Sequence, residues 1–243
     1  MNLLMLGANS DVASAVAKKF AQLEKAHLFL ASRNMELLEK QAQDLRIRYQ
    51  VKVETLYFNA IDFASHKNFY EMLQSKPDIV VLSFGYLGDQ LKAEDEFKEA
   101  QNIIDSNFVG AVSILEPIAA DFEKRGHGLI IGISSVAGER GRRSNYFYGA
   151  AKGALTIYLS GLRSRLSKRK IRVITVLPGF IQTKMTEHLE LPERLSAKPD
   201  EVADDIYRAY KKGKDIIYTK WFWKWIMAVI KSIPEKIFKR LTF

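Results

Sequence analysis

Short apolar runs alternate along this chain with stretches in which apolar residues recur every three or four positions. The short runs are typical of buried parallel strands, and the longer stretches are typical of helices that pack on a sheet through one face. This alternation predicts an α/β fold of repeated strand–helix units, with helices on both faces of a parallel sheet. The candidate strands are Leu3–Leu6, Ala26–Ala31, Lys52–Tyr57, Ile79–Ser83, Gly128–Ile133, Arg172–Leu177 and Asp215–Tyr218.

Helices are predicted between these runs. Before the second strand, Ala13, Val16 and Phe20 recur at helical spacing and form one apolar face. No linker or composition break interrupts the first part of the chain, so residues 1–218 are predicted to form one domain and residues 219–243 an attached basic, aromatic, amphipathic segment. The other helix candidates are Glu36–Tyr49, His66–Leu73, Glu94–Lys124, Gly149–Lys168 and Asp200–Lys211.

Composition and charge narrow the possible classes of protein. The 243 residues are 47% hydrophobic and 27% charged, which suits one globular domain with a sizeable core. The absence of cysteine excludes disulfides and thiolate chemistry, and no metal site is expected. The net charge of +9 favours an anionic partner such as a phosphorylated substrate, a nucleic acid or an acidic membrane face, although a generally basic enzyme explains it equally well. Met1–Leu6 is too short for a signal peptide, so a cytoplasmic location is expected.

The turn after the first strand, residues 7–13, is a candidate phosphate-binding loop. Such a turn places backbone N–H groups and the positive end of a helix beneath a pyrophosphate. The loop keeps Gly7, but Asp11, which suits a helix N-cap, and Ala13 stand where further glycines are common. A plain strand-to-helix turn explains the loop nearly as well. The candidate cofactor contacts here are Gly7, Asn9, Ser10, Asp11 and Val12.

The end of the second strand bears on the choice of cofactor. Sites selective for NAD place a carboxylate there to bind the ribose 2′-hydroxyl, whereas this chain has Ser32 followed by Arg33. A guanidinium can pair with a 2′-phosphate through two charge-assisted hydrogen bonds, so NADPH is favoured, with NADH still possible. The alternative is a solvated loop arginine. Asp62, after the third strand, suits either a contact with the adenine or the N-cap of the next helix.

The candidate chemistry follows the fifth strand. Ser135 comes directly after this strand, and Tyr148 and Lys152 follow at a spacing that puts them on one face of a helix. An ammonium beside a phenol favours the phenolate, which predicts a pKa of Tyr148 lowered toward neutrality. A serine hydroxyl can hold a carbonyl oxygen together with the phenol. The set therefore predicts reduction of a ketone, with Tyr148 as the proton donor.

The chain resembles the short-chain dehydrogenase/reductase family over nearly its full length. This resemblance implies a Rossmann-like, doubly wound, seven-stranded sheet, a homodimer or homotetramer, and a Ser-Tyr-Lys-Asn active site. It also implies that Asn107 anchors a proton-relay water and that Lys152 binds the nicotinamide ribose. Ile181 and Thr183 are then placed to hold the nicotinamide carboxamide. The matching residues are Gly7, Asp62, Asn107, Ser135, Tyr148, Lys152, Pro178, Gly179 and Thr183.

Two departures from the family pattern concern the cofactor. The glycine loop is depleted, and Ser83-Phe84-Gly85 replaces the usual Asn-Asn-Ala-Gly after the fourth strand. Phe84 and Gly85 are therefore expected close to the cofactor. These departures are similar to the pattern of one subgroup, the keto-reductase half of the decaprenylphosphoryl-ribose epimerase system, in residues 84–89, 137–145 and 233–241. That resemblance implies reduction of a 2-keto-pentose on a polyprenyl phosphate, after a partner oxidase has made the ketone for cell envelope biosynthesis.

Three arginines support an anionic substrate. Arg140, Arg142 and Arg143 lie between Ser135 and Tyr148, so their loop must run near the substrate mouth. Guanidinium groups suit a phosphate better than an uncharged ketone. A solvated loop or a subunit contact is an equally good explanation. The candidate substrate contacts are Arg140, Arg142, Arg143 and Tyr146.

The end of the chain suits a membrane surface. Trp221–Ile230 is about half as long as a membrane span and is rich in tryptophan, which settles among lipid headgroups. Residues 214–243 carry seven Lys/Arg and two acids. Such a basic amphipathic segment lies on an anionic membrane and does not cross it. Alternatively, these aromatics cover the substrate cleft or a subunit interface.

Other functions remain open at this stage. A soluble ketone, such as a 3-ketoacyl thioester or a steroid-like molecule, is an alternative substrate. A non-catalytic nucleotide-binding regulator would not need the set Asn107, Ser135, Tyr148 and Lys152. No nucleic-acid partner is expected, because no recognition motif is present and the positive charge is concentrated near the tryptophans.

Overall fold

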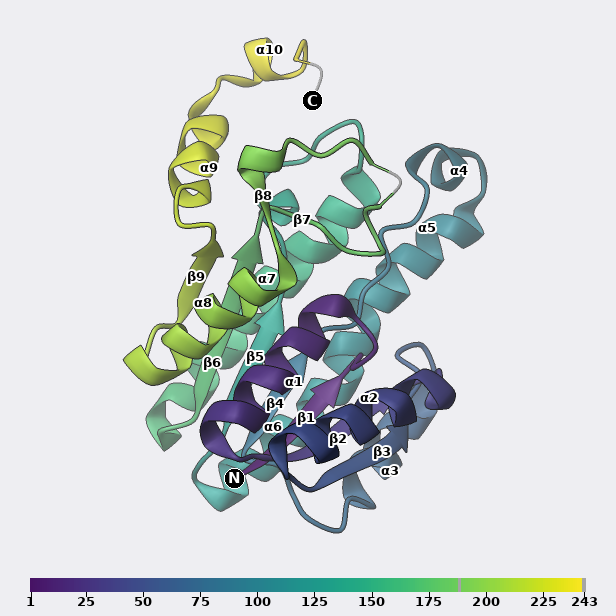
Figure 1. The fold of residues 1–243 in the computed structure, drawn as a ribbon. Helices are drawn as coiled ribbons and strands as arrows, with labels where there is room; N and C mark the ends of the chain where they lie inside the picture. The colour runs from purple at the N-terminus through teal and green to yellow at the C-terminus, as the bar shows by residue number, and fades with distance from the viewer. Residues whose placement is uncertain (188, 242–243) are drawn as a thin grey trace.

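The computed structural model describes residues 1–187 and 189–241. In this part of the chain, seven parallel strands form the central sheet, in the order β3-β2-β1-β4-β5-β6-β9 (Figure 1). The predicted doubly wound α/β fold is confirmed. The strands are β1 (Asn2–Leu6), β2 (His27–Ser32), β3 (Val53–Tyr57), β4 (Ile79–Leu82), β5 (Leu129–Ile133), β6 (Arg172–Pro178) and β9 (Ile216–Thr219).

The strand order reverses between β1 and β4, and this reversal positions the site. The chain runs outward from β1 through β2 to β3, then returns to β4 on the other side of β1. The loops that leave β1 and β4 therefore diverge and open a crevice at the carboxyl edge of the sheet, where ligands of such sheets bind. Leu3–Leu6 of β1 are fully buried, because both faces of this central strand are covered by helices.

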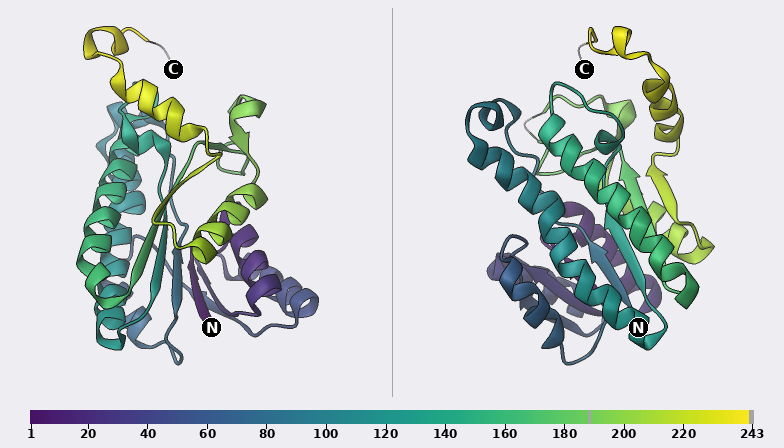
Figure 2. Two further views of the ribbon diagram at one scale, coloured as in Figure 1. Left: turned by 90° about the vertical axis from the view of Figure 1, so that its left-hand side faces the viewer. Right: turned by 180° about the vertical axis from the view of Figure 1, so that it is seen from behind.

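Two helical layers cover the sheet, as the left view of Figure 2 shows. One face packs on α1, α2 and α8 through a core that includes Leu3 and Met5 of β1. The other packs on α3, α6 and α7 through a core that includes Leu4 and Leu6. The helices are α1 (Asp11–Glu24), α2 (Met35–Tyr49), α3 (Phe63–Glu71), α6 (Gly110–Arg125), α7 (Tyr146–Leu166) and α8 (Pro199–Lys212).

One long helix was predicted over Glu94–Lys124, and the structure corrects this. The predicted range begins near the end of α4 (Gln90–Asp95), which the extended residue Glu96 separates from α5 (Phe97–Ile104). A π-helical turn, Asp105–Val109, then precedes α6. The apolar periodicity continues through these breaks, so it did not reveal them. By length and composition the continuous stretch from α5 through α6 could cross a membrane, but the apolar face of α6 is packed on the sheet.

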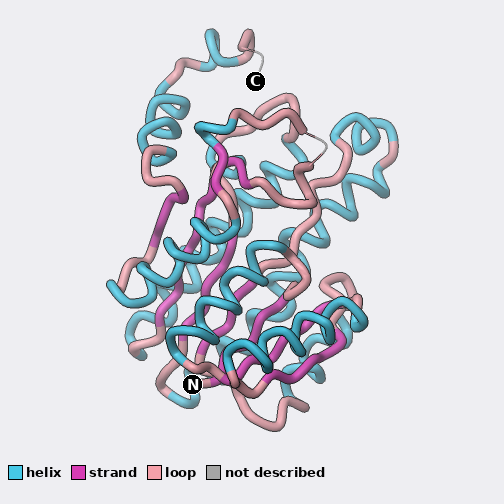
Figure 3. The backbone as a smooth tube through the Cα atoms, viewed as in Figure 1, coloured by secondary structure: helices cyan, strands magenta, loops and turns pink. Residues whose placement is uncertain are grey.

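Short elements beyond the carboxyl edge of the sheet complete the fold. β7 (Phe180–Ile181) and β8 (Ser196–Ala197) form a small second sheet that was not predicted, because two-residue strands leave no periodic pattern. After β9 the chain forms α9 (Trp223–Ser232) and α10 (Glu235–Phe238). Figure 3 shows these helices at the same end of the molecule as the loops that leave the strands.

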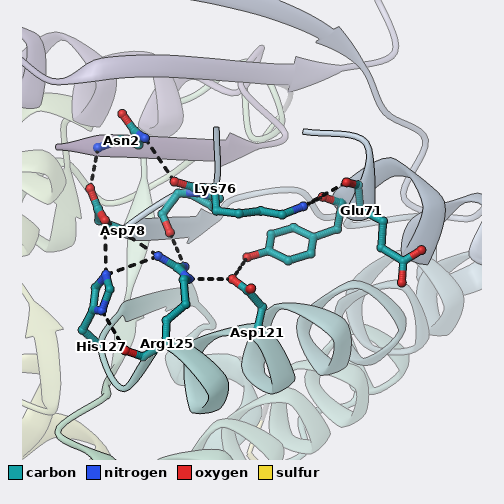
Figure 4. A network of polar contacts seen from close by, with 9 residues as sticks. Asn2, Glu71, Lys76, Asp78, Asp121, Arg125 and His127 are labelled. Carbon is teal, nitrogen blue, oxygen red and sulfur yellow. Dashed lines mark hydrogen bonds and ion pairs between the residues drawn. The ribbon is translucent and has the colours of Figure 1, made fainter. Parts of the chain in front are cut away.

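A polar network fastens the opposite edge of the sheet, far from the crevice (Figure 4). Asp78, just before β4, accepts a hydrogen bond of 2.8 Å from the backbone of Asn2. Arg125, at the end of α6, donates to Asp121 and to the carbonyl of Pro77 at 2.8 and 2.6 Å. These hydrogen bonds join the start of β1, the residues before β4 and the end of α6.

Candidate active site

Two adjoining cavities occupy the crevice at the carboxyl edge of the sheet. The catalytic cavity, of about 270 Å³, is lined by Ser135, Tyr148 and Lys152. The nucleotide cavity, of about 410 Å³, is lined by Ser32 and Arg33. The two share lining residues from the loops after β1 and β4 and from the segment after β7, so one elongated ligand could occupy both. The shared residues are Asn9, Ser10, Ser83, Phe84, Gly85 and Met185.

The structure brings the predicted chemical groups together. Ser135 follows β5 and is buried, and its hydroxyl accepts a hydrogen bond of 3.1 Å from the backbone of Ala137. The hydroxyl of the half-buried Tyr148 forms a hydrogen bond with that of Ser135. Lys152, one turn later on α7, is 4% exposed; its Nζ donates to the carbonyl of Ile133 at 3.1 Å and lies 5.8 Å from the Tyr148 ring centroid.

The protonation states differ from the sequence prediction. Burial raises the pKa of Tyr148 to about 12, and the hydrogen bond from Ser135 offsets only part of this rise. Burial also lowers the pKa of Lys152 to about 8. The prediction that Lys152 lowers the pKa of Tyr148 toward neutrality is therefore wrong for the protein alone, because burial penalises the charged form of both groups. At neutral pH the phenol keeps its proton, which is the state that a proton donor needs.

Asn107 lies in the π-helical turn between α5 and α6 and is 1% exposed. Its amide nitrogen donates to the carbonyls of Tyr86 and Ile103 at 2.6 and 2.8 Å, and its oxygen accepts from the backbone of Tyr86 at 3.3 Å. A Cβ on Gly85 would lie 2.8 Å from that oxygen. Asn107 thus fixes the loop after β4 against the catalytic cavity, and its role with a relay water stays a prediction.

The loop after β1 has the form of a phosphate-binding turn. Gly7 has a positive φ of +83°, and a Cβ there would lie 2.6 Å from the backbone nitrogen of Phe84. Ser10 is the N-cap of α1: its hydroxyl accepts from the backbone of Ala13 at 3.1 Å and contacts the hydroxyl of Ser83 at 2.8 Å. This corrects the N-cap role suggested for Asp11, whose carboxylate accepts from the backbone of Lys184 at 2.8 Å.

The residues around the nucleotide cavity fit a phosphorylated dinucleotide. The side-chain oxygen of Asn9 is buried and accepts no hydrogen bond from any described residue, and a ribose hydroxyl could donate one. The guanidinium of Arg33 is exposed at the cavity and has no ion pair with any described residue.

Asp62 is exposed at the start of α3 and lines neither cavity, unlike Asn59 and Ile61, so its contact with adenine stays a prediction. The remaining predicted contacts, Val12, Pro178, Gly179, Ile181 and Thr183, line the catalytic cavity.

Of the predicted substrate contacts, only Arg142 lines the catalytic cavity. Burial lowers the pKa of its guanidinium, which has no side-chain partner within the described part of the chain. Asn145, which was not predicted as a site residue, also lines the cavity, and its buried side-chain oxygen has no hydrogen-bond partner among residues 1–187 and 189–241. Arg143 is exposed outside the cavity, and Tyr146 is exposed against the ring of Phe147, so neither is placed as predicted.

Arg140 serves the C-terminal segment, which corrects its predicted substrate role. Its guanidinium donates to the carbonyls of Ile230, Lys231 and Ile233 at 2.8 to 3.0 Å, at the end of α9. It also pairs with Glu235 at 3.0 Å and stacks 3.8 Å from the ring of Phe238. A cation is favourable at this end of a helix, where carbonyl groups lack partners. We call this set of contacts the Arg140 clasp.

The clasp holds α9 where it forms part of the catalytic cavity. Trp223 is 4% exposed and lines the cavity; its indole nitrogen donates to the carbonyl of Leu195 at 3.1 Å. Its ring meets Phe180 edge to face at 5.5 Å, and a Cβ on Gly179 would overlap it. The alternative that tail aromatics cover the cleft is therefore correct for this face of α9. In the sequence, the cluster of tryptophans at residues 221–225 indicated this contact, but it did not show that Trp223 is the ring that points into the cavity.

Comparisons with known proteins agree with this geometry. A family model described as short chain dehydrogenase matches residues 2–194. An uncharacterized oxidoreductase of Mycobacterium tuberculosis is 34% identical over 242 residues, covering 98% of this chain and 96% of that protein. Among solved structures, a short-chain dehydrogenase from Sphingobium yanoikuyae in complex with NADPH superposes with a TM-score of 0.83, at 21% identity and 96% coverage of each chain.

The fold is also that of an actinorhodin polyketide ketoreductase solved with NADPH, with a TM-score of 0.79, 20% identity and coverage of 89% of this chain and 94% of the other. The solved structures support the fold, and the family model covers most of the chain together with Ser135, Tyr148 and Lys152. The chain therefore belongs to the short-chain dehydrogenase/reductase family of NAD(P)-dependent oxidoreductases.

Proposed function

We propose that the protein uses NADPH to reduce a ketone to a secondary alcohol, and that the ketone is a 2-keto-pentose carried on a polyprenyl phosphate. The observation that carries the substrate proposal is that Arg142 and Asn145 both line the catalytic cavity. Arg142 offers a cation that pairs with no described side chain, and Asn145 offers a buried acceptor. A hydroxylated, anionic substrate would satisfy both groups.

The residues around Tyr148 suit the reduction. NADPH, when bound, supplies the hydride that the carbonyl carbon gains. Tyr148 gives its proton to the carbonyl oxygen, and the hydroxyl of Ser135 holds that oxygen in place. The ammonium of Lys152 stabilises the negative charge that Tyr148 acquires as it loses the proton. The product is a secondary alcohol.

The remaining wall of the cavity favours a substrate with an apolar part. Phe180, Leu189 and Trp223 line it, and Leu189 is 42% exposed at its rim. Such a wall accepts the first isoprene units of a lipid carrier while Arg142 meets the phosphate. In this scheme a partner oxidase first oxidises the alcohol to the ketone. The protein then reduces the ketone to the alcohol of inverted configuration. It does so as a homo-oligomer in the cytoplasm. A soluble ketone such as a 3-ketoacyl thioester is the second candidate, because a polyketide ketoreductase shares the fold.

The cofactor proposal predicts the effect of Arg33→Asp. The new carboxylate removes a charge-assisted pair with the 2′-phosphate and adds repulsion, at a cost of roughly 2–3 kcal/mol for NADPH binding. This corresponds to a loss of about 30–150-fold in affinity, with little loss for NADH. Fluorescence titration with each cofactor measures the change. Arg169→Asp, the same change at an exposed site outside both cavities, is the control. Equal constants for Arg33→Asp and wild type would contradict the assignment.

The substrate proposal predicts the effect of Arg142→Gln. Loss of the cation is expected to raise KM for a short-chain polyprenyl-phosphate keto-pentose about 10–100-fold, because a hydrogen bond to a charged group contributes about 1.5–3 kcal/mol. KM for cyclohexanone, which has no anionic group, should stay near that of wild type. Arg143→Gln removes the same charge one residue later, outside the cavity, and should leave both constants unchanged. A wild-type enzyme that reduces acyl thioesters and ignores the keto-pentose would favour the second candidate.

A further inference from the structure

Helix α9 presents two apolar faces, of which only one is covered. Trp223 and Met227 are 4% and 5% exposed and pack beside Val136 and Leu177. Trp225 and Val229 are 61% and 64% exposed, and Trp221, just before the helix, is 73% exposed. A spacing of four residues puts these three side chains on one side of the helical segment. We call Trp221, Trp225 and Val229 the outer face.

The segment that carries the outer face is rich in basic residues. Residues 220–241 contain six Lys/Arg and one acid, Glu235, whose carboxylate is paired with Arg140. Lys224 lies 5.6 Å from the ring of Trp225. Two further apolar side chains, Ile237 and Leu241, are 54% and 37% exposed between the basic residues of α10 and the turn that follows it. The basic residues without an ion pair to any described residue are Lys224, Lys236, Lys239 and Arg240.

We propose that the outer face and the basic residues of its segment dock the protein on an anionic membrane surface. Tryptophan rings settle among lipid headgroups, and each lysine or arginine adds attraction to anionic lipid. A second copy of this chain is a poorer occupant, since a symmetric contact would bring the lysines of both copies together. An anionic lipid surface supplies the opposite charge over the same area.

The fixed position of α9 makes the docking specific. The Arg140 clasp holds the end of the helix, and Lys231 is paired with Glu139 at 2.6 Å. Glu139 and Arg140 both belong to the segment between Ser135 and Tyr148. The same ten-residue helix therefore meets the membrane through one face and lines the catalytic cavity through Trp223. In this respect the proposal deepens the proposed function, because it brings the cavity to the surface where a lipid-linked ketone would reside.

The structure also decides how the docking must be tested. Deleting residues 221–243 would remove Trp223 and the partners of Arg140, so it would damage the catalytic cavity along with the outer face. The sharper variant is Trp221→Ser/Trp225→Ser/Val229→Ser, which changes only exposed side chains. Its matched control is a triple serine variant of exposed apolar residues elsewhere, Ile47, Met72 and Ile157, which are 79%, 73% and 75% exposed.

The experiment is co-sedimentation of the full chain with phosphatidylglycerol vesicles and with phosphatidylcholine vesicles. We expect wild type and the control to bind the anionic vesicles at low salt, to be released at high salt and to bind the neutral vesicles weakly. The outer-face variant should bind the anionic vesicles at least about tenfold more weakly, given the apolar area lost. Circular dichroism checks that all three proteins are folded.

Three results would overturn the proposal. They are failure of wild type to sediment with anionic vesicles at low salt, equal binding of the outer-face variant and wild type, or loss of a wild-type oligomer in that variant without vesicle binding. The last result, measured by light scattering, would mean that a second copy covers the face. NADPH oxidation with cyclohexanone, assayed without vesicles, should be unchanged in the outer-face variant. Failure of docking is thereby distinguished from failure of the proposed reaction.

Discussion

Replacing Tyr148 by phenylalanine is expected to lower the rate of ketone reduction by about 10²–10⁴-fold, the usual contribution of general acid catalysis. In the proposed reaction the phenol hydroxyl is the proton donor, and burial keeps it protonated by raising its pKa to about 12. The change removes one oxygen and preserves the ring. NADPH binding should therefore be largely unchanged.

Stopped-flow measurement of NADPH oxidation gives the rate, and fluorescence titration gives the cofactor affinity. Tyr146→Phe is the matched control, since it removes the same oxygen from the same helix at an exposed position outside the cavity. If Tyr148→Phe kept more than about a tenth of wild-type turnover, another group would have to be the proton donor.

The second large effect is expected for Lys152→Met and appears in the pH profile. Burial lowers the pKa of Lys152 to about 8, so its ammonium is present below that pH and is lost above it. The proposed reaction needs this charge to stabilise Tyr148 as it gives up its proton. In wild type, kcat/KM for reduction should therefore fall as the pH rises through about 8. Tyr148, with a pKa of about 12, stays protonated over that range and does not cause the fall.

Lys152→Met should lower kcat/KM about 10²–10³-fold at neutral pH, as loss of a preorganised electrostatic contact does. It should also abolish the fall near pH 8, which a merely structural lysine would not control. Lys168→Met, an exposed change beyond the end of α7, serves as the control. If kcat/KM of Lys152→Met still fell near pH 8 as in wild type, a group other than Lys152 would cause the fall.

The sequence predicted the parts of the site that depend on local spacing. Tyr148 and Lys152 share a helix face wherever that helix lies, and Ser135 follows a strand whose apolar run is visible in the sequence. The loops at residues 7–13 and 83–85 follow strands in the same way. Parallel strands bring their carboxyl ends to one edge, so these segments meet once the strand order is known.

The sequence could not predict contacts between distant segments. Arg140 lies 90 residues before Ile230, and no local pattern shows that its guanidinium would bind the end of α9 and not a substrate phosphate. The inward direction of Trp223 depends on the room that Gly179 leaves for its ring. The pKa of Tyr148 was mispredicted because spacing reveals a neighbouring charge but not the depth of burial.

The most direct test of the central claim is the transfer of label from NADPH to a ketone. NADPH carrying deuterium at carbon 4 of the nicotinamide is incubated with the enzyme and a short-chain polyprenyl-phosphate keto-pentose, and the product is analysed by mass spectrometry and NMR. The account predicts one deuterium on the carbon that bears the new hydroxyl group, formed by wild type and lost with Tyr148→Phe. Absence of deuterium from this product, and from the alcohols of a panel of soluble ketones, would contradict the assignment of the protein as a ketone reductase.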